Sequence, residues 1–411
     1  MTSCSQRNRT SIHSSIETET AQLYDKLVEV RRDIYTNPEL AGNEVRTQRI
    51  IKQYLLDLGL EVETGTYGNS VVGILNTGKA GKKIAWRAEM DALPNDFPDS
   101  SPFKSVVDGV QHGCGHDVHM AIGLGIAEVL TKHKEYLTGS VYFIFQPEEE
   151  TFIGAKSMVE AGLFSKIDPE EIYTLHITPL PVGKIMVKPN ALYAHQKRVK
   201  ITLKNNLTEA EATALYDDIR RQVSRFEPES KPWEIQGIVD PEIGLHNPST
   251  IFKDYLFMDE NAVIQEDSEG LHIQAYLYET NRANLSTILS KIERIIKKTE
   301  HGDKLLALSY SQGNPTIMND TQLTNKSINT LKEIYGKDLM LPNYGQVPYF
   351  NDDFCYFQQN VPGVYFFLGG SNFEKGMIAM NHAPNFRVDE EAIKIGVRSF
   401  SSLIVERLKD D

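Results

Sequence analysis

The sequence predicts an α/β protein with a mostly parallel sheet and a smaller α+β insert. Three observations lead to this expectation. The chain has 411 residues, which gives room for two to three domains at about 150 residues each. Helix-length and strand-length segments alternate over 118–177, and this alternation is typical of a parallel sheet. After Pro189 the pattern changes to two strand-plus-helix units, which end near Gly302 and have the size of one compact domain.

The N-terminal part is expected to hold a polar tail and two helices. Residues 1–20 are polar and contain no apolar stretch, so we expect a mobile tail and no secretory signal. Apolar residues at helical spacing predict a first helix over 21–35, which ends before Pro38. The second predicted helix covers 46–58 and is followed by Gly59, a common residue after a helix end.

The remaining elements follow from the same two periodicities. Short β-prone segments predict strands over 60–65, 70–75, 83–90, 139–145, 171–177, 198–203, 271–277 and 363–367. Apolar residues at helical spacing predict helices over 118–133, 154–161, 208–226, 284–298, 321–335 and 390–408. Thr208 and Glu211 have the spacing of a capping box, which marks the start of one of these helices. We expect 309–317 to begin a return to the first domain.

Composition excludes several classes of protein. Lys and Arg number 43 against 56 Asp and Glu, so the formal net charge is −13, which argues against a general nucleic-acid or anionic-membrane binder. No apolar run approaches the about 18 residues that a bilayer span requires. The three cysteines, Cys4, Cys114 and Cys355, are too few and too scattered for a disulfide framework, so we expect a reducing, cytoplasmic location.

The loop before the 118–133 helix concentrates reactive side chains. Its sequence over 112–119, HGCGHDVH, contains three histidines, a cysteine and an aspartate. Cys114 and His116 are a plausible pair of ligands for a transition metal, and Asp117 or His119 could fix the tautomer of a ligating imidazole. The alternative is a polar helix-start loop with a buried free cysteine.

Polar residues also follow other predicted strands. The strand over 139–145 runs into an acidic loop with Glu149 and Glu150, and α/β sheets carry active sites in loops at this edge. One carboxylate could hold a cation while the other acts as a general base, although acidic runs are usually solvated surface. Asp91 and His176 stand at the ends of two further strands. A single histidine in such a place is more often an ordinary partly buried residue than a ligand.

Considered together, these strand ends predict a metal site. The candidate side chains are Asp91, Cys114, His116, Glu149, Glu150, His176 and, near the carboxyl terminus, His382. Mixed sulfur, nitrogen and oxygen ligands suit zinc, manganese or cobalt, and there are enough ligands for two ions. Spacing alone therefore predicts a metal-dependent hydrolase and nothing narrower.

Five segments in order carry a resemblance to a known family. They are NPEL at 37–40, RAEMDALP at 87–94, CGHDVH at 114–119, FQPEEE at 145–150, and PGVYFFLG at 362–369 followed by His382. Together they resemble the metal-dependent aminoacylase, hippurate hydrolase and indole-acetyl-amino-acid hydrolase family, relatives of the dinuclear carboxypeptidases and dipeptidases. The resemblance covers most of the chain outside the tail and the insert.

The resemblance implies a role for each candidate residue. The implied metal ligands are Cys114, His116, Glu150, His176 and His382. Glu149 is implied as the general base, which takes a proton from metal-activated water and delivers it to the leaving nitrogen of an amide. Asp91 is implied to lie beside the site, and Asp353 matches an acidic position of the family. The cofactor is then a pair of divalent ions per subunit, zinc or manganese, with cobalt as an alternative.

The same resemblance implies the domain arrangement and the substrate. A catalytic domain in two pieces, 21–190 and 306–411, surrounds an inserted lid and dimerisation domain over 191–305. The implied reaction hydrolyses an N-acyl amino acid or a related small amide to a carboxylic acid and an amino acid. The implied partners are this small molecule and a second copy of the chain, and the composition adds the expectation of no nucleic acid and no membrane.

One element of the family pattern is missing. After the predicted strand of the insert, 199–203, family members carry a Gly-Gly-His element, and this sequence has no histidine there. His195, His246 or His272 could substitute from another position, the substrate could be bound differently, or activity could be weak. Glu89 replaces an aspartate of the family and leaves the ligands intact. Two alternatives therefore stay open, a dipeptidase or carboxypeptidase of the same family and a metal-containing binding protein with reduced or no catalysis.

Overall fold

The computed structural model describes residues 2–227 and 229–409, with side chains described from residue 12 onward. The chain divides into two compact units. Unit 1 contains Met1–Asn190, Met318–Leu341 and Asp352–Asp411. Unit 2 contains Ala191–Ile317 and Pro342–Asn351.

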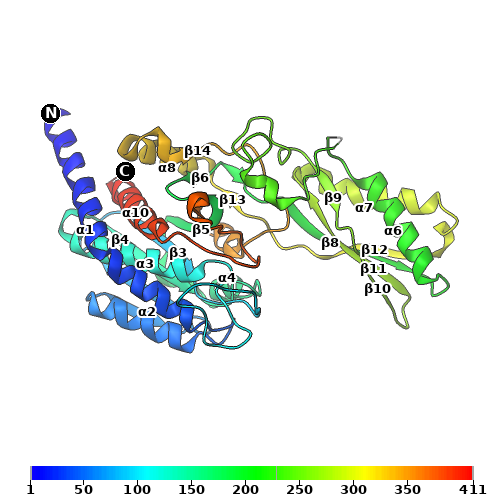
Figure 1. Ribbon diagram of the computed structural model, residues 1–411, viewed down its shortest axis with the longest axis horizontal. Coiled ribbons are helices and arrows are strands. Elements are labelled where there is room, and N and C mark those ends of the chain that lie inside the picture. The colour runs from blue at the N-terminus through cyan, green and yellow to red at the C-terminus, as the bar shows by residue number, and fades with distance from the viewer. Residues whose placement is uncertain (1, 228, 410–411) are drawn as a thin grey trace. The chain divides into compact units, whose positions relative to one another are not determined.

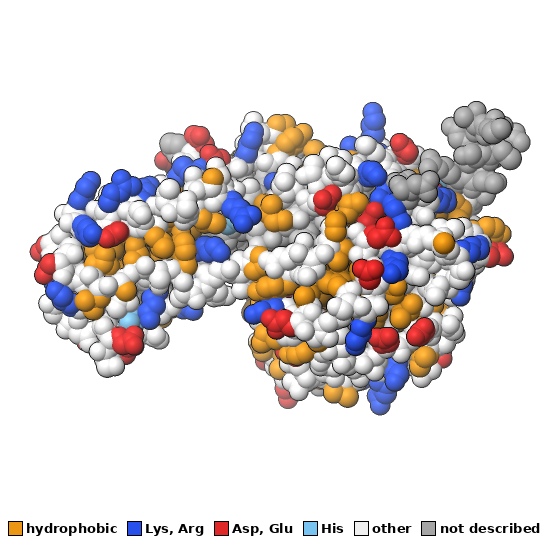
Figure 2. All heavy atoms as spheres, turned by 180° about the vertical axis from the view of Figure 1, so that it is seen from behind, with side chains coloured by type: hydrophobic (Ala, Val, Ile, Leu, Met, Phe, Trp, Pro, Cys, Tyr) orange, Lys and Arg blue, Asp and Glu red, His pale blue; other side chains and the backbone are white. Residues whose placement is uncertain are grey.

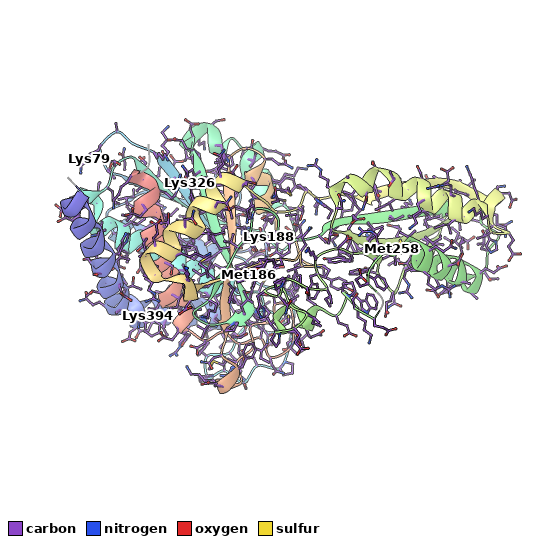
Figure 3. All side chains as sticks on the ribbon, turned by 90° about the horizontal axis from the view of Figure 1, so that it is seen from above. Lys79, Met186, Lys188, Met258, Lys326 and Lys394 are labelled. Atoms are coloured by element: carbon purple, nitrogen blue, oxygen red, sulfur yellow. The ribbon has the colours of Figure 1, made fainter. Side chains whose placement is uncertain are left out.

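Unit 1 is built on an eight-stranded sheet with the order β1-β2-β4-β3-β5-β15-β6-β14 (Figure 1). Its strands are β1 (Glu61–Thr64), β2 (Val71–Asn76), β3 (Lys83–Glu89), β4 (Ser140–Gln146), β5 (Glu171–Pro181), β6 (Ile185–Met186), β14 (Met340–Leu341) and β15 (Gly363–Ser371). The strands β4, β3, β5 and β15 run parallel, while β2 is antiparallel to β4. Phe367 of β15 also pairs with Met186 of β6. Figure 3 labels Met186. The predicted mostly parallel sheet is confirmed.

The central strands β3 and β15 are almost entirely buried. In β3 only Lys83 is partly exposed, and every residue of β15 is buried. Parallel strands that helices cover on both faces are buried in this way, because neither face contacts water. Both strands lie where they were expected.

Three long helices of unit 1 lie side by side (Figure 1). The helices of this unit are α1 (Thr2–Thr36), α2 (Val45–Asp57), α3 (His116–Lys132), α4 (Gly154–Glu160), α5 (Leu163–Ile167), α8 (Thr321–Tyr335), α9 (Phe354–Gln358) and α10 (Glu391–Lys409). A Cβ at Gly125 of α3 would lie 2.5 Å from Val397 of α10 and 2.7 Å from Leu27 of α1. Glycine therefore allows α1, α3 and α10 to approach closely. The ring of Phe400 in α10 lies 5.0 Å from that of Trp86 in β3, so this helix layer packs on the sheet.

The start of α1 corrects one expectation. A mobile tail was expected over 1–20, but α1 begins at Thr2, and Met1 lies outside the described residues. Ile16 is fully buried in the core of unit 1. His13 lies 3.0 Å from Ser402 and 3.2 Å from Glu406, both on α10. Tertiary packing stabilises this polar segment as a helix, although its Ser and Thr residues have low helix propensity.

Unit 2 contains an antiparallel sheet with the order β10-β11-β8-β12, and β9 also pairs with β11. Its elements are β8 (His195–Leu203), α6 (Glu209–Val223), β9 (Leu256–Met258), β10 (Val263–Glu266), β11 (Leu271–Glu279), α7 (Leu285–Lys297) and β12 (Leu305–Gln312). Alternate residues of β8 and β11, such as Ile201 and Ile273, pack against α6 and α7. The capping box of Thr208 and Glu211 is present at the start of α6, as predicted.

The boundary of the insert also differs from the expected 191–305. The strand β12 pairs with β8, so the segment that was expected to begin the return belongs to the sheet of unit 2. The short segment Pro342–Asn351 is also part of unit 2, because the backbones of Tyr344 and Gln346 bond to Leu245 and Phe252. The periodicity of a sequence predicts individual helices and strands. The sheet to which a strand belongs depends on the strand with which it pairs.

Several short strands and 3₁₀ helices connect the longer elements. The remaining strands are β7 (Asn190–Ala191) and β13 (Met318–Asn319), and 3₁₀ helices occupy Lys134–Tyr136, Ile235–Val239, Arg282–Asn284, Gly302–Lys304, Lys337–Leu339 and Phe373–Lys375. Charged side chains of both signs are scattered over the face that Figure 2 shows. None of the described helices combines the length and the hydropathy that crossing a bilayer requires.

Candidate metal centre

A sharp turn presents Cys114 and His116 at the start of α3. Between them Gly115 has a φ of +100°, in the left-handed region that favours glycine. A Cβ at this position would also lie 3.2 Å from the Cβ of Ile177 and 3.4 Å from the ring of Phe386. The turn therefore lets two side chains that are two residues apart face one group of neighbours.

The side chain of Cys114 contacts two histidines from distant parts of the chain. Its Sγ lies 3.4 Å from Nε2 of His176, in β5, and 3.2 Å from Nε2 of His382, which follows β15. The same Nε2 of His382 lies 3.3 Å from Oε1 of Glu150. The ligand-type atoms of Cys114, Glu150 and His382 all lie within 4.8 Å of one another, which is close enough to share a metal ion.

His116 belongs to a second group. Its Nδ1 donates to the backbone oxygen of Asp91 at 2.8 Å, which leaves the Nε2 lone pair for another partner. This Nε2 lies 3.8 Å from Oε2 of Glu149 and 3.8 Å from Oε1 of Glu150. Glu150 belongs to both groups, so these side chains would offer ligands to more than one divalent cation.

Asp91 holds the acidic loop that follows β4. Its Oδ1 accepts the backbone N–H of Glu149 at 3.1 Å, and its Oδ2 accepts that of Glu150 at 2.9 Å. Its Oδ1 also lies 3.5 Å from Nδ1 of His116. Asp91 therefore contacts the acidic loop and the imidazole at the same time, and the structure places it beside the other candidate residues.

Two buried polar atoms at this centre indicate whether a cation fits there. Neither Nε2 of His116 nor Oε1 of Glu150 makes a hydrogen bond of normal geometry among the described residues. Buried polar atoms without such partners are costly, and in native structures they often mark the place of an ion or a water. Sulfur, imidazole and carboxylate donors suit divalent metals of the zinc and manganese type. A divalent cation therefore fits the residues that are present.

The two adjacent glutamates differ in their proton affinity. Burial raises the pKa of Glu149 well above its ordinary value, and the charges of Asp352, Glu150 and Asp353 raise it further. Burial also acts to raise the pKa of Glu150, but the ion-pair contact with Nε2 of His382, 3.3 Å away, and the charge of His116 outweigh it and lower that pKa. Neighbouring carboxyls whose pKa values move apart can divide the roles of proton carrier and ligand.

His116 has a raised proton affinity in the absence of a cation. Burial alone would lower its pKa, but the hydrogen bond that it donates to Asp91 and the charges of Glu89, Asp91 and Glu150 raise it to about 10. The surrounding carboxylates therefore favour positive charge at this point, whether a proton or a metal ion supplies it.

A buried arginine lies behind the acidic side chains. Arg87 donates to Asp352 and to Asp353, each at 2.9 Å, and it also pairs with Glu89. Burial raises the pKa of Asp353 to about 8, although the Arg87 charge opposes this. Sequence reasoning did not single out Arg87 as part of the site. The available signal was that residues 87 and 89 lie on one face of a strand.

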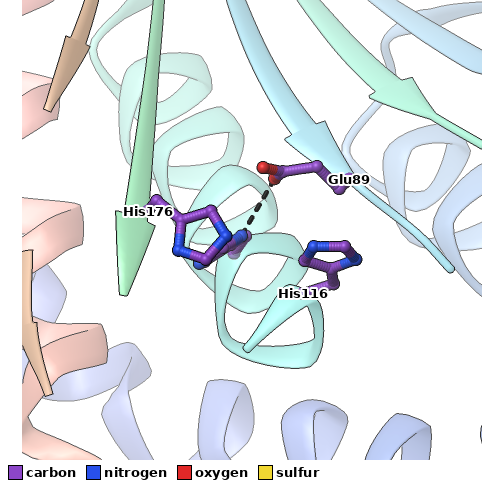
Figure 4. A group of neighbouring side chains, drawn as sticks. Glu89, His116 and His176 are labelled. Atoms are coloured by element: carbon purple, nitrogen blue, oxygen red, sulfur yellow. Dashed lines mark hydrogen bonds and ion pairs between the residues drawn. The ribbon is translucent and has the colours of Figure 1, made fainter. Parts of the chain in front are cut away.

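Asp117 and His119 make different contacts in the structure. The Oδ2 of Asp117 pairs with Nε of Arg31 at 2.5 Å. The Nδ1 of His119 lies 2.9 Å from Oε2 of Glu89, and the dashed line in Figure 4 marks this contact beside His116 and His176. His119, rather than Asp117, therefore lies among the imidazoles of the centre.

The predicted site residues come together in unit 1. This holds for Asp91, Cys114, His116, Glu149, Glu150, His176 and His382. The substitutes that were considered for the missing histidine belong to unit 2. Among them, His272 lies 3.1 Å from Oγ1 of Thr202 and 3.0 Å from Oδ1 of Asp267.

Comparisons with known proteins give the family and the fold of this chain. The family described as "Peptidase family M20/M25/M40" matches residues 85–406. Thermostable carboxypeptidase 2 of Saccharolobus solfataricus is 31% identical over 95% of this chain and 98% of its own. N-acetyldiaminopimelate deacetylase of Brevibacillus brevis is 30% identical over 91% of this chain and 96% of its own. The solved structure of the Bacillus subtilis YxeP protein, a dinuclear metal-binding peptidase, has a TM-score of 0.76 at 24% identity, over 95% of this chain and 99% of that one, and this likeness concerns the fold.

Proposed function

The chain belongs to peptidase family M20/M25/M40 and is a metal-dependent amidohydrolase, and we propose that its substrate is an N-acyl amino acid. The observation that carries the proposal is the convergence of sulfur, imidazole and carboxylate donors around Glu150, with Nε2 of His116 left without a hydrogen bond among the described residues. Two relatives named as deacetylases of N-acetylated amino acids support the substrate class.

Each proposed ligand has a possible metal-binding atom close to those of the others. They are Cys114, His116, Glu150, His176 and His382. Divalent ions held there would acidify water and polarise the amide carbonyl. The mixed donor set supports zinc or manganese, with cobalt as an alternative.

Glu149 is proposed as the residue that moves the proton. Its raised proton affinity suits a carboxylate that takes a proton from the attacking water and gives it to the leaving nitrogen. Asp91 keeps this carboxylate in place through the backbone amides of the acidic loop. Bond cleavage then yields a carboxylic acid and a free amino acid.

The direct test combines a substrate panel with one substitution. Purified protein supplied with manganese, zinc or cobalt should release amino acids from N-acyl amino acids. Glu149→Gln should abolish this release while the metal content stays unchanged, because Gln cannot accept the proton. The neighbouring Glu148→Gln is the matched control and should retain activity. Full activity of Glu149→Gln would remove this residue as the base.

A second candidate is a carboxypeptidase, which the similarity to thermostable carboxypeptidase 2 favours. The two candidates differ in the group on the acyl side of the scissile bond. Preference for peptides longer than two residues over acetyl-amino acids would support the carboxypeptidase. The reverse order of kcat/KM would support the acylase.

We also propose a cytoplasmic location and a homodimer. Cys114 and Cys355 are free thiols in the described structure, which suits a reducing cytoplasm. The strand β12 forms an edge of the sheet in unit 2, and an open edge can pair with a second copy of the chain. Fractionation and light scattering test these two proposals.

A further inference from the structure

The strands β3 and β5 separate just before the metal centre. Their pairing ends with Arg87 opposite Thr174, whereas β5 continues to Pro181 along β15. Ile177 lies three residues past the end of this pairing. Its backbone groups therefore need partners other than β3, because buried N–H and C=O groups are costly when unpaired.

Two imidazoles supply these partners. The N–H of Ile177 donates to Nε2 of His119 at 2.9 Å. The C=O of Ile177 accepts from Nδ1 of His176 at 2.7 Å. One residue of β5 is thus held at both of its backbone polar groups by histidines.

The tautomers follow from which group must donate. A backbone N–H can only donate, so Nε2 of His119 is the acceptor and its proton lies on Nδ1, which donates to Oε2 of Glu89 at 2.9 Å. Both nitrogens of His119 are then occupied. His119 therefore cannot bind a cation while these contacts persist, although it lies in one group with Glu89, His116 and His176.

His176 has the complementary arrangement. Because its Nδ1 donates to the carbonyl of Ile177, its Nε2 carries the free lone pair and points to Sγ of Cys114, 3.4 Å away. The direction of this lone pair depends on where the Ile177 backbone lies. Ile177 lies in register with Leu368 of β15, and its N–H on the open side is held by His119, which Glu89 holds in turn. The chain of contacts therefore runs from β3 to the metal centre without a direct bond between the two imidazoles.

We propose that His119 is a positioning residue, which sets the direction and the tautomer of His176 through the backbone of Ile177. This inference rests on the proposed function, in which His176 is a metal ligand. Contacts of this outer kind commonly change metal affinity by about 10- to 100-fold when they are removed.

The test compares two substitutions of similar bulk. His119→Leu removes the acceptor for the Ile177 N–H, while His119→Gln keeps an oxygen that can accept it. We expect His119→Leu to weaken metal binding by about 10-fold or more in competition titrations with a chelator dye, and to shift the visible absorption bands of the cobalt-loaded protein. His119→Gln should restore most of both. Equal losses in both variants, with unchanged melting temperatures, would contradict the inference.

A purely structural role predicts another result. It would lower the melting temperature of the metal-free protein in both variants and leave metal affinity and the cobalt spectrum unchanged. If His119→Leu does not fold, the ¹⁵N chemical shifts of the histidines in the unsubstituted protein still decide the matter. A proton on Nε2 of His119 would overturn the proposed arrangement.

His176→Ala separates this inference from the proposed function. Loss of metal in His176→Ala together with unchanged affinity in His119→Leu would refute the positioning role and leave the ligand set standing. Full metal content in His176→Ala would instead refute His176 as a ligand and with it the positioning role of His119, while the substrate panel would still decide the proposed function.

Discussion

The Sγ of Cys114 lies 3.2 Å from Nε2 of His382, although 268 residues separate the two along the chain. Backbone contacts hold the two loops together independently of these side chains. The N–H of His382 donates to the carbonyl of Gly113 at 3.0 Å, and the side chain of Asn381 donates to the carbonyl of Cys114 at 2.8 Å. The geometry of the centre is therefore built largely by the fold, and a ligand can be removed without dismantling it.

Cys114→Ala should lower the metal-to-protein ratio while the metal-free protein keeps its melting temperature. The thiolate is lost, but the backbone contacts of both loops remain. Elemental analysis after dialysis against a fixed free metal concentration measures the ratio. Cys355→Ala, at the other buried cysteine, is the matched control. An unchanged ratio in Cys114→Ala would count against thiolate ligation.

Asp91→Ala should lower kcat by about 10- to 100-fold with a smaller effect on metal content. The substitution removes the acceptors for the amides of Glu149 and Glu150, so the acidic loop loses its fixed place. The contact of His116 with the backbone oxygen of residue 91 remains. Asp91→Asn keeps one acceptor oxygen and should lie between the alanine variant and the unsubstituted protein. Steady-state kinetics at saturating metal distinguishes these outcomes.

Ile16→Ala should destabilise unit 1 by about 2–5 kcal/mol, as expected for a fully buried aliphatic side chain. The exposed Thr18→Ala, one half-turn away on α1, should change stability by less than about 0.5 kcal/mol. Urea unfolding followed by circular dichroism measures both. Equal stability of the two variants would mean that this part of α1 does not contribute to the core.

Glu171→Gln should destabilise the protein by about 3–5 kcal/mol at pH 7, because it leaves the buried charge of Arg407 without its carboxylate. Burial acts to raise the pKa of Glu171, but the hydrogen bonds of Arg407 and Tyr173 outweigh it and lower that pKa. A lowered folded-state pKa means that the stabilisation is present above the unfolded value, near about 4.3, and is lost as pH falls through the folded value.

The difference in unfolding free energy between Glu171→Gln and the unsubstituted protein should therefore shrink from pH 5 to pH 3. Urea titrations of the metal-free proteins at several pH values give this difference. The exposed neighbour Glu170→Gln is the control and should show little dependence on pH in the same range. A gap that stays constant down to pH 3 would argue that the Glu171 carboxylate is not stabilised by Arg407.

Much of the fold of unit 1 was predictable because the apolar residues of its helices and strands recur with a regular period. The helix expected over 321–335 has the same bounds in the structure, and β3, β4 and β15 lie where short β-prone segments predicted strands. The first half of α1 was not predictable, since its polar sequence becomes helical through contacts with α10. The place of β12 depends on its pairing with β8, which no local pattern encodes.

The candidate centre was predictable to the level of its reactive side chains. Cys114 and Glu150 stand out because a thiol in a glycine-rich loop and a carboxylate after a buried strand are unusual. The contacts behind them were not predictable, because the partner of a buried charge such as Arg87 comes from position 352 or 353, far away in sequence. The part played by a backbone group, such as that of Ile177, has no signature in the identity of the side chain.

The left-handed backbone at Gly115 has a consequence for how this protein can change over evolution. The residue offers no reactive group, yet any other amino acid there would face both an unfavourable φ and crowding from Ile177. Steric constraints alone are therefore expected to exclude substitutions at this position. A tolerated Gly115→Ala substitution in a saturation library selected for turnover would show that the loop has more freedom than its geometry suggests.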